Sequence, residues 1–233
     1  MIDLRPHARL GGARHGWLDT RHHFSFAQYH DPTRMHWGRL RVWNDDIIAP
    51  QSGFPPHPHQ DMEIITYVRS GAITHQDSLG NHGHTLAGDV QVMSAGTGIL
   101  HSEYNLEDEP TRIFQIWIMP DQRGLPPSWR TRAFPRGDRA GAFITLASGL
   151  ENDPAEVLPI RADARLAAAT LMQGQIADYH LAPERKAYMV PATGAIEVNG
   201  VLAEAGDGLA IRDETLLQVR AHRDAEVILV DVA

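Results

Sequence analysis

Two histidines stand one residue apart in the string HPHQDMEIITYV, residues 57–68. The composition of this string indicates a β-strand, in which residues i and i+2 lie on the same face with their side chains a few ångströms apart. His57 and His59 would then present two imidazoles to one face of a sheet. Such a pair is either a polar feature of a sheet surface or half of a metal site.

A second pair with the same spacing, His101 and Glu103, follows in MSAGTGILHSEYN. If the two segments are neighbouring strands and these side chains face inward, three imidazole nitrogens and one carboxylate converge. That ligand set suits a first-row divalent metal such as Fe, Mn, Co, Ni or Zn. In an octahedral site it leaves two positions for a substrate and dioxygen, whereas a closed structural zinc site usually uses cysteine. The spacing therefore predicts one metal site from His57, His59 and His101, with Glu103 as the candidate carboxylate.

Other polar residues near these pairs have alternative interpretations. Glu63 follows His59 by four positions and competes with Glu103 for an inward-facing place. A further H-x-H pair, His82 and His84, stands in a turn-like context of Gly and Asn, which favours a solvated hairpin tip.

The remaining histidines and aromatic residues of the first half give weaker signals. His75 falls in a strand-like stretch and is interpreted as a surface residue of the sheet. The early histidines either line the mouth of a pocket or lie on the surface: His15, His22 and His23. The early aromatic residues are interpreted as core or inter-domain packing: Trp17, Phe24, Phe26 and Trp37.

Composition limits the classes of function. With 42% hydrophobic and 21% charged residues over 233 positions, the chain is an ordinary soluble globular protein. Its net charge of -8 argues against direct binding to nucleic acid or to anionic membranes. The N-terminus lacks the apolar segment of a signal peptide, and no stretch approaches the roughly 18 apolar residues of a membrane span. We therefore expect a cytoplasmic protein, and we expect a monomer.

The distribution of two residue types confines the chemistry. Cysteine is absent, which excludes disulfides, thiolate catalysis and sulfur-ligated metals. Histidine occurs 14 times, and twelve of these residues lie at or before residue 101. Any histidine chemistry therefore belongs to the first half of the chain.

The elements that must position these residues are predicted to be strands. Short runs such as LRVWNDDII, EIITYVRSG, RIFQIWIM and EVILVDV are rich in Val, Ile, Thr and aromatic residues and end at Gly, Pro, Asn or Asp. Only residues 154–171 have a composition that suits a helix, and Pro159 interrupts them. The pattern predicts an all-β sandwich or barrel.

An internal echo indicates two similar barrels. Residues 67–94 and residues 188–213 each contain an aromatic strand start, a G-A-I strand, a turn with Asn and Gly, and A-G-D before an apolar strand. Repetition of one β-unit favours duplication of a barrel. The stretch of residues 120–139 is rich in Pro, Gly and Arg and is the expected connector.

The strings around both pairs resemble the two motifs of the cupin fold. GFPPHPHQDMEIITYV is similar to the first motif, although its Gly-to-His spacing is short, and GDVQVMSAGTGILHSEYN is similar to the second, with Ser94 in place of the usual proline. These departures are typical of the pirins, a bicupin family with H-P-H and M-S-A-G-x-G-I-x-H-S-E strings. HHFSFAQYHDP and LRVWNDDII also resemble the N-terminal region of pirins. The likeness is strongest over residues 13–120 and is closest to bacterial pirin-like quercetin 2,3-dioxygenases.

The resemblance implies a fold and a ligand set. It implies an all-β chain of two cupin domains (β-barrels, or jelly rolls) packed face to face: a metal-binding domain at residues 1–130 and a second domain without metal ligands at residues 131–233. The pirin ligands carry over to this chain, and Glu63 then becomes a candidate to orient a histidine. Pirins usually hold Fe²⁺, with Zn, Mn, Co, Ni and Cu as further options. The carried-over ligands are His57, His59, His101 and Glu103.

The resemblance leaves two functions open. One is a dioxygenase that cleaves a flavonol such as quercetin with O₂ and releases CO, with Glu103 as the catalytic base. The other is a non-catalytic, metal-dependent regulator that binds a partner protein. A metal beside a space large enough for a flavonol favours the enzyme, and a capped metal beneath a flat surface favours the regulator.

Overall fold

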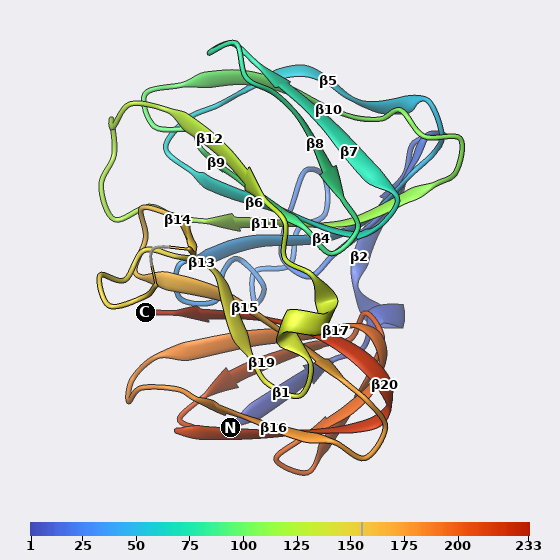
Figure 1. Cartoon of the computed structure of the whole chain (residues 1–233), viewed down its shortest axis with the longest axis vertical. Helices are drawn as coiled ribbons and strands as arrows, with labels where there is room; N and C mark the ends of the chain where they lie inside the picture. Colours follow the sequence, from blue (N-terminus) through green and yellow to red (C-terminus); the bar gives the residue numbers. More distant parts are fainter. Residues whose placement is uncertain (155) are drawn as a thin grey trace.

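The chain folds almost entirely into β-strands. The structure is a computed structural model and describes residues 1–154 and 156–233. In these residues the regular elements other than strands are two short 3₁₀ helices, η1 (His7–Arg9) and η2 (Arg136–Arg139). Figure 1 shows two β-domains stacked along the long axis of the molecule. The described part of the chain contains no helix that is long and apolar enough to cross a membrane.

The first domain consists of two antiparallel sheets that face each other. A seven-stranded sheet has the order β12-β9-β6-β11-β4-β3-β2, and a four-stranded sheet has the order β5-β10-β7-β8. The four-stranded sheet is at the top of Figure 1. The strands are β2 (Gly11–Arg14), β3 (Leu18–His22), β4 (Leu40–Ile48), β5 (Ser52–His59), β6 (Glu63–Ser70), β7 (Ala72–Asp77), β8 (His82–Leu86), β9 (Val90–Ser94), β10 (Ile99–Asn105), β11 (Thr111–Ile118) and β12 (Ser128–Arg132).

The second domain is one strongly curved sheet of nine strands. Its main order is β1-β19-β17-β20-β15-β13-β14, with β16 on β20 and β18 on β17. The N-terminal strand β1 pairs with β19 and so belongs to this sheet, as the blue strand among the red and orange ones in Figure 1 shows. The strands are β1 (Ile2–Arg5), β13 (Ile144–Ser148), β14 (Leu158–Pro159), β15 (Ala164–Leu171), β16 (Ile176–His180), β17 (Lys186–Val198), β18 (Val201–Glu204), β19 (Gly208–Arg212) and β20 (Leu216–Val232).

The two faces of the seven-stranded sheet have different surroundings: one packs against the second domain and the other faces the interior of the first barrel. On β11, Phe114 and Ile116 belong to the large apolar cluster shared with the second domain, whereas Gln115 faces the interior of the first barrel and donates to Glu103 on the opposite sheet. The two-residue period of a strand produces this division directly. Tyr188 on β17 and other second-domain residues complete the shared cluster. Two sheets thus pack face to face, and the predicted all-β fold of two barrels is confirmed.

A buried charged group lies where the two domains meet. Glu226 on β20 accepts hydrogen bonds from Arg139, at 2.6 Å, and from Tyr67 of the first domain. Arg136 adds an ion pair at 2.9 Å. The predicted connector, residues 120–139, therefore contributes β12 to the first barrel and η2 to this junction. The division of the chain at residue 130 stays a prediction.

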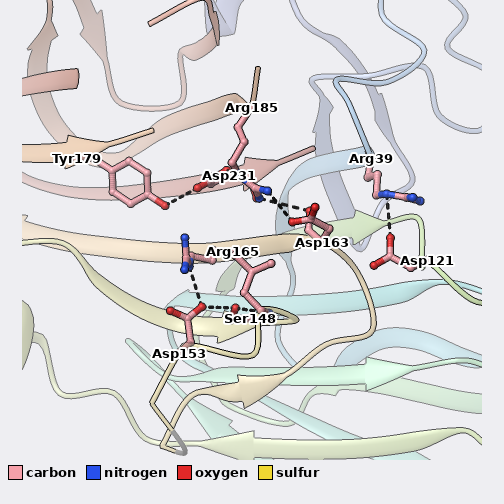
Figure 2. Close-up of polar contacts among 10 residues, drawn as sticks. Arg39, Asp121, Ser148, Asp153, Asp163, Arg165, Tyr179, Arg185 and Asp231 are labelled. Atoms are coloured by element: carbon pink, nitrogen blue, oxygen red, sulfur yellow. Dashed lines mark hydrogen bonds and ion pairs between the residues drawn. The ribbon is translucent and has the colours of Figure 1, made fainter. Parts of the chain in front are cut away.

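A second set of ion pairs holds Asp163, the residue directly before β15. Figure 2 shows Arg185 between Asp163 and Asp231, with Tyr179 donating to Asp231 at 2.9 Å. Asp231 on β20 is almost fully buried, so its charge is compensated by these donors. Through Arg185, the start of β15 is thereby tied to the C-terminal strand.

Candidate metal centre

Three histidines converge at one end of the first barrel. The antiparallel pairing of β5 with β10 places His57 directly opposite His101, and His59 lies one pleat away on the same face. The ring centroids are 4.5 Å apart for His57 and His101, 4.7 Å for His57 and His59, and 4.9 Å for His59 and His101. One ring nitrogen of each lies within 4.8 Å of one ring nitrogen of the others. The predicted H-x-H pair and the histidine of the H-x-E pair are therefore together in space.

Hydrogen bonds and burial prepare these imidazoles to act as ligands. Nδ1 of His57 lies 2.7 Å from the carbonyl oxygen of Pro55. Since a carbonyl can only accept, Nδ1 carries the proton and the lone pair remains on Nε2. Burial, followed by the charge of His57, lowers the pKa of His59 to about 4. Burial also lowers the pKa of His101, and the neighbouring histidines lower it further. Neutral imidazoles of this kind bind metals.

The arrangement fits a divalent transition metal. Nε2 of His101 is buried and has no hydrogen-bond partner among the described residues. An unpartnered buried nitrogen is costly, and coordination to an ion would satisfy it. Three converging imidazoles are a ligand set that first-row divalent metals prefer. Trp117 packs edge-on against His59 at 5.0 Å and shields this side of the triad.

Glu103 lies deeper in the barrel and is held by three other side chains. It follows His101 on β10 across a bulge, and it is fully buried. One carboxylate oxygen accepts from Thr66 at 2.8 Å and from Gln91, and the other accepts from Gln115 at 2.6 Å. The compact triad does not include this carboxylate. Burial raises the pKa of Glu103 to about 7, against the lowering effect of the hydrogen bonds from Thr66 and Gln91.

A buried His–Asp pair stands behind the triad. His75 on β7 is fully buried rather than on the sheet surface, so that expectation is wrong. Its Nε2 donates to Asp77 at 3.0 Å, and its Nδ1 lies 3.5 Å from Nδ1 of His101. Because the carboxylate fixes the proton of His75 on Nε2, Nδ1 of His75 can accept from His101 and leave Nε2 of His101 free. His75 and Asp77 share the i, i+2 spacing of the other pairs, which is the signal that the sequence offered.

The other candidate residues have different surroundings. Glu63 accepts from Ser94 at 2.6 Å and from the backbone N–H of Arg161 at 3.2 Å, rather than from a histidine. It therefore joins the first barrel to a loop of the second domain, and the expectation that it orients a histidine is wrong. His82 and His84 are exposed, but they lie on β8 and not in its preceding turn.

A cavity of about 320 Å³ lies beside the site. It contacts the site through two residues: Phe54, whose ring lies 6.2 Å from that of His57, and Gln115, which donates to Glu103. His15 and His22 line this cavity, whereas His23 is buried and hydrogen bonded to Tyr188 at 2.9 Å. The lining residues are Gly12, Ala13, His15, Leu18, Thr20, His22, Phe26, Ala27, Gln28, Tyr29, Asn44, Asp46, Phe54 and Gln115.

Comparison with known proteins finds relatives over nearly the whole chain. The family model described as Pirin matches residues 4–118, and the model described as Quercetinase C-terminal cupin domain matches residues 145–232. A protein of Pseudomonas aeruginosa that is named only provisionally as a quercetin 2,3-dioxygenase is 70% identical over 100% of both chains. The quercetin 2,3-dioxygenase of Escherichia coli strain K12 is 42% identical, over 100% of this chain and 99% of its own.

A solved structure matches the whole fold. The crystal structure of a bacterial pirin from Escherichia coli in complex with nickel(II) superimposes with a TM-score of 0.93 at 42% identity, covering 100% of this chain and 99% of that chain. The similarity therefore extends over both barrels and not only over the strands with the histidines.

Proposed function

Since the chain belongs to the pirin family, we propose that it is a metal-dependent dioxygenase that cleaves a flavonol such as quercetin with O₂ and releases CO. The observation that carries this proposal is the compact histidine triad next to a cavity of about 320 Å³. This volume lies at the lower end of the range of small-molecule sites. The cavity also supports the enzyme over the alternative of a regulator with a capped metal.

The proposed metal ligands are His57, His59 and His101, with Glu103 as the fourth. Fe²⁺ is the proposed native ion, and the nickel(II) complex of the related pirin indicates that other divalent ions suit such a site. When bound, the ion supplies a positive charge that stabilises the enolate of the flavonol and a place where O₂ can react. The histidines hold and tune the ion, and the pair of His75 and Asp77 sets the orientation of one of them.

Glu103 is the proposed base for the 3-hydroxyl of the flavonol. Its pKa of about 7 is suited to accepting a proton near neutral pH. To serve as ligand and base, the carboxylate must exchange one of its hydrogen bonds, which it receives from Thr66, Gln91 and Gln115. Gln115 lines the cavity, so its bond is the one that a substrate entering there would replace.

Apolar side chains of the cavity would keep water away from the reacting flavonol. Phe26 and Phe54 supply aromatic surface, and Leu18 adds an aliphatic contact. Exclusion of water strengthens the electrostatic contacts of the proton-accepting carboxylate. The cavity thus binds the planar ring system and orients its chelating oxygens toward the triad.

A stepwise reconstitution tests the proposal. The metal-free protein is loaded with Fe²⁺ without oxygen, quercetin is added, and oxygen is then admitted while CO and O₂ uptake are measured. We expect one CO released for each O₂ consumed. Glu103→Gln should keep most of its metal and lose about 100-fold or more in turnover, because the base is absent. Fully loaded wild-type protein that releases no CO would overturn the proposal.

A further inference from the structure

The cavity contains a buried carboxylate that the proposed reaction does not use. Asp46 on β4 is 2% exposed and lines the cavity. Its Oδ1 is buried and has no hydrogen-bond donor among the described residues. Leaving a buried carboxylate oxygen without a donor is costly, so this atom calls for a partner.

The backbone explains why Asp46 faces the cavity. Side chains alternate along β4, so Asn44 and Asp46 share the cavity face while Asp45 points to the other face and pairs with Arg69. The neighbouring strand β3 places Thr20 directly opposite Asp46. Asp46 therefore occupies a fixed position on a rigid sheet and not on a loop.

The surrounding atoms define what kind of ligand fits. Nδ1 of His22 donates to the side-chain oxygen of Asn44 at 2.9 Å, which leaves Nε2 of His22 as an acceptor. Asp46 adds a second acceptor, and the lining residues include no Lys or Arg. Such a cavity is matched by a ligand that donates hydrogen bonds and carries no carboxylate or phosphate. The aromatic rings of Phe26 and Tyr29 add a preference for a planar ring.

We propose that Asp46 accepts a hydrogen bond from a phenolic hydroxyl of the bound ligand, and that it is a specificity-determining residue for polyhydroxylated aromatic substrates. This inference rests on the proposed function, because it assigns the part of the flavonol that does not chelate the metal. Burial, and to a lesser extent the charges of Asp45 and Glu103, raises the pKa of Asp46 to about 7, against the lowering effect of Thr20. A hydrogen bond from a phenolic hydroxyl would replace the water that the buried carboxylate of Asp46 has lost.

Two flavonols distinguish the role of Asp46 from that of the metal. Quercetin and 3-hydroxyflavone share the 3-hydroxyl and 4-carbonyl, but 3-hydroxyflavone has no other hydroxyl group. Binding of each to the iron-loaded protein is measured by calorimetry without oxygen, so no turnover is required. We expect the wild type to bind quercetin about tenfold or more tightly than 3-hydroxyflavone, in line with a hydrogen bond to a charged group.

The variant Asp46→Asn should lose this preference and bind 3-hydroxyflavone as the wild type does. Asp19→Asn is the matched control, because Asp19 lies on β3, outside the cavity lining, and should leave both affinities unchanged. Equal binding of both flavonols by the wild type, or an unchanged preference in Asp46→Asn, would overturn the inference. A preference that depends on Asp46 in a protein that releases no CO would sustain the inference and refute the dioxygenase.

Discussion

The interiors of the two barrels differ sharply although their folds are alike. In the first barrel, the buried apolar side chains outside the domain interface form two small clusters, around Ile73 and around Met93, and the polar groups of the site are buried in the same barrel. In the second barrel, one continuous core of aliphatic residues fills the interior, including Met189 and Leu229. The two histidines of the second half, His180 and His222, are exposed.

This difference separates chemistry from stability. A buried carboxylate such as Glu103 is tolerated only because three donors surround it, and each interior position used for such a donor is lost to apolar packing. The second barrel has one such group in the same sheet, Asp231, which Arg185 and Tyr179 compensate, and it packs the rest of its core with alkyl groups. The apolar interface between the domains then joins the first barrel, with its polar interior, to the second barrel, with its aliphatic core.

Removal of a proposed ligand should have the largest effect. His101→Ala should weaken metal binding by more than about 1000-fold, since total binding free energies of four-ligand sites on the order of 10 kcal/mol or more imply several kcal/mol per ligand. Elemental analysis after dialysis measures the metal, and circular dichroism checks that the fold remains. Undiminished metal in a folded variant would remove His101 from the site.

A large-to-small substitution in the aliphatic core should lower stability and leave metal binding unchanged. Leu229→Ala, at a fully buried position of the second barrel, should lower the free energy of unfolding by about 3 kcal/mol through the cavity it creates. Metal stoichiometry should stay that of the wild type. Urea denaturation and elemental analysis measure the two quantities. Leu202→Ala, at a half-exposed position, is the control. A loss of metal in folded Leu229→Ala would show that the two barrels are not separable in this way.

Disruption of the His–Asp pair behind the triad should lower metal affinity by less than the loss of a ligand does. In Asp77→Asn, one of the two acceptor oxygens becomes an amide group, so the proton of His75 is no longer fixed on Nε2. We expect metal affinity to fall about tenfold, the lower end for groups that orient a ligand. Calorimetric titration with Ni²⁺ measures this, and Asp178→Asn at an exposed position of the second barrel is the control. Unchanged affinity would restrict His75 and Asp77 to a packing role.

The smallest effect is a pH dependence of the metal-free protein. The pKa values of Glu103 and Asp46 are raised to about 7 in the folded state. At these two groups the folded protein holds protons that the unfolded chain has already released, so their contribution to stability falls as pH rises through 7. The lowered pKa values of His59 and His101 act in the opposite direction, so the test is a difference between two proteins. Between pH 6.5 and 8 the wild type should lose about 1 kcal/mol more of its free energy of unfolding than Glu103→Gln, as measured by urea denaturation. The same pH dependence in both proteins would contradict the raised pKa of Glu103.

The sequence could predict the parts of the site that depend on local spacing. His57 and His59 share a face because strands have a two-residue period, and this needs no knowledge of the rest of the fold. The donors around Glu103 could not be predicted in the same way. Thr66, Gln91 and Gln115 come from three strands of the opposite sheet, and their convergence depends on register across the barrel.

The local sequence pattern also could not predict which polar residues are buried inside the barrel. His75 lies in a run that does not show which face of the strand is inside, and only its place directly opposite the buried Glu103 on β10 makes it interior. Asp46 belongs to the polar string NDD within a strand of mostly apolar residues, which gave no sign of a cavity. The overall fold, in contrast, was predictable because many short strands, the repeated unit and the two histidine strings all indicate the same architecture.

Anomalous diffraction from crystals of the iron-loaded protein, recorded at the iron edge, shows which barrel holds the ion. We expect one peak in each chain, about 2.0–2.2 Å from the Nε2 atoms of the three histidines, with the carboxylate of Glu103 turned toward it. The aliphatic interior of the second barrel should show no peak. A peak away from the triad, or a second peak of equal height in the second barrel, would contradict the division between a barrel for chemistry and a barrel for stability.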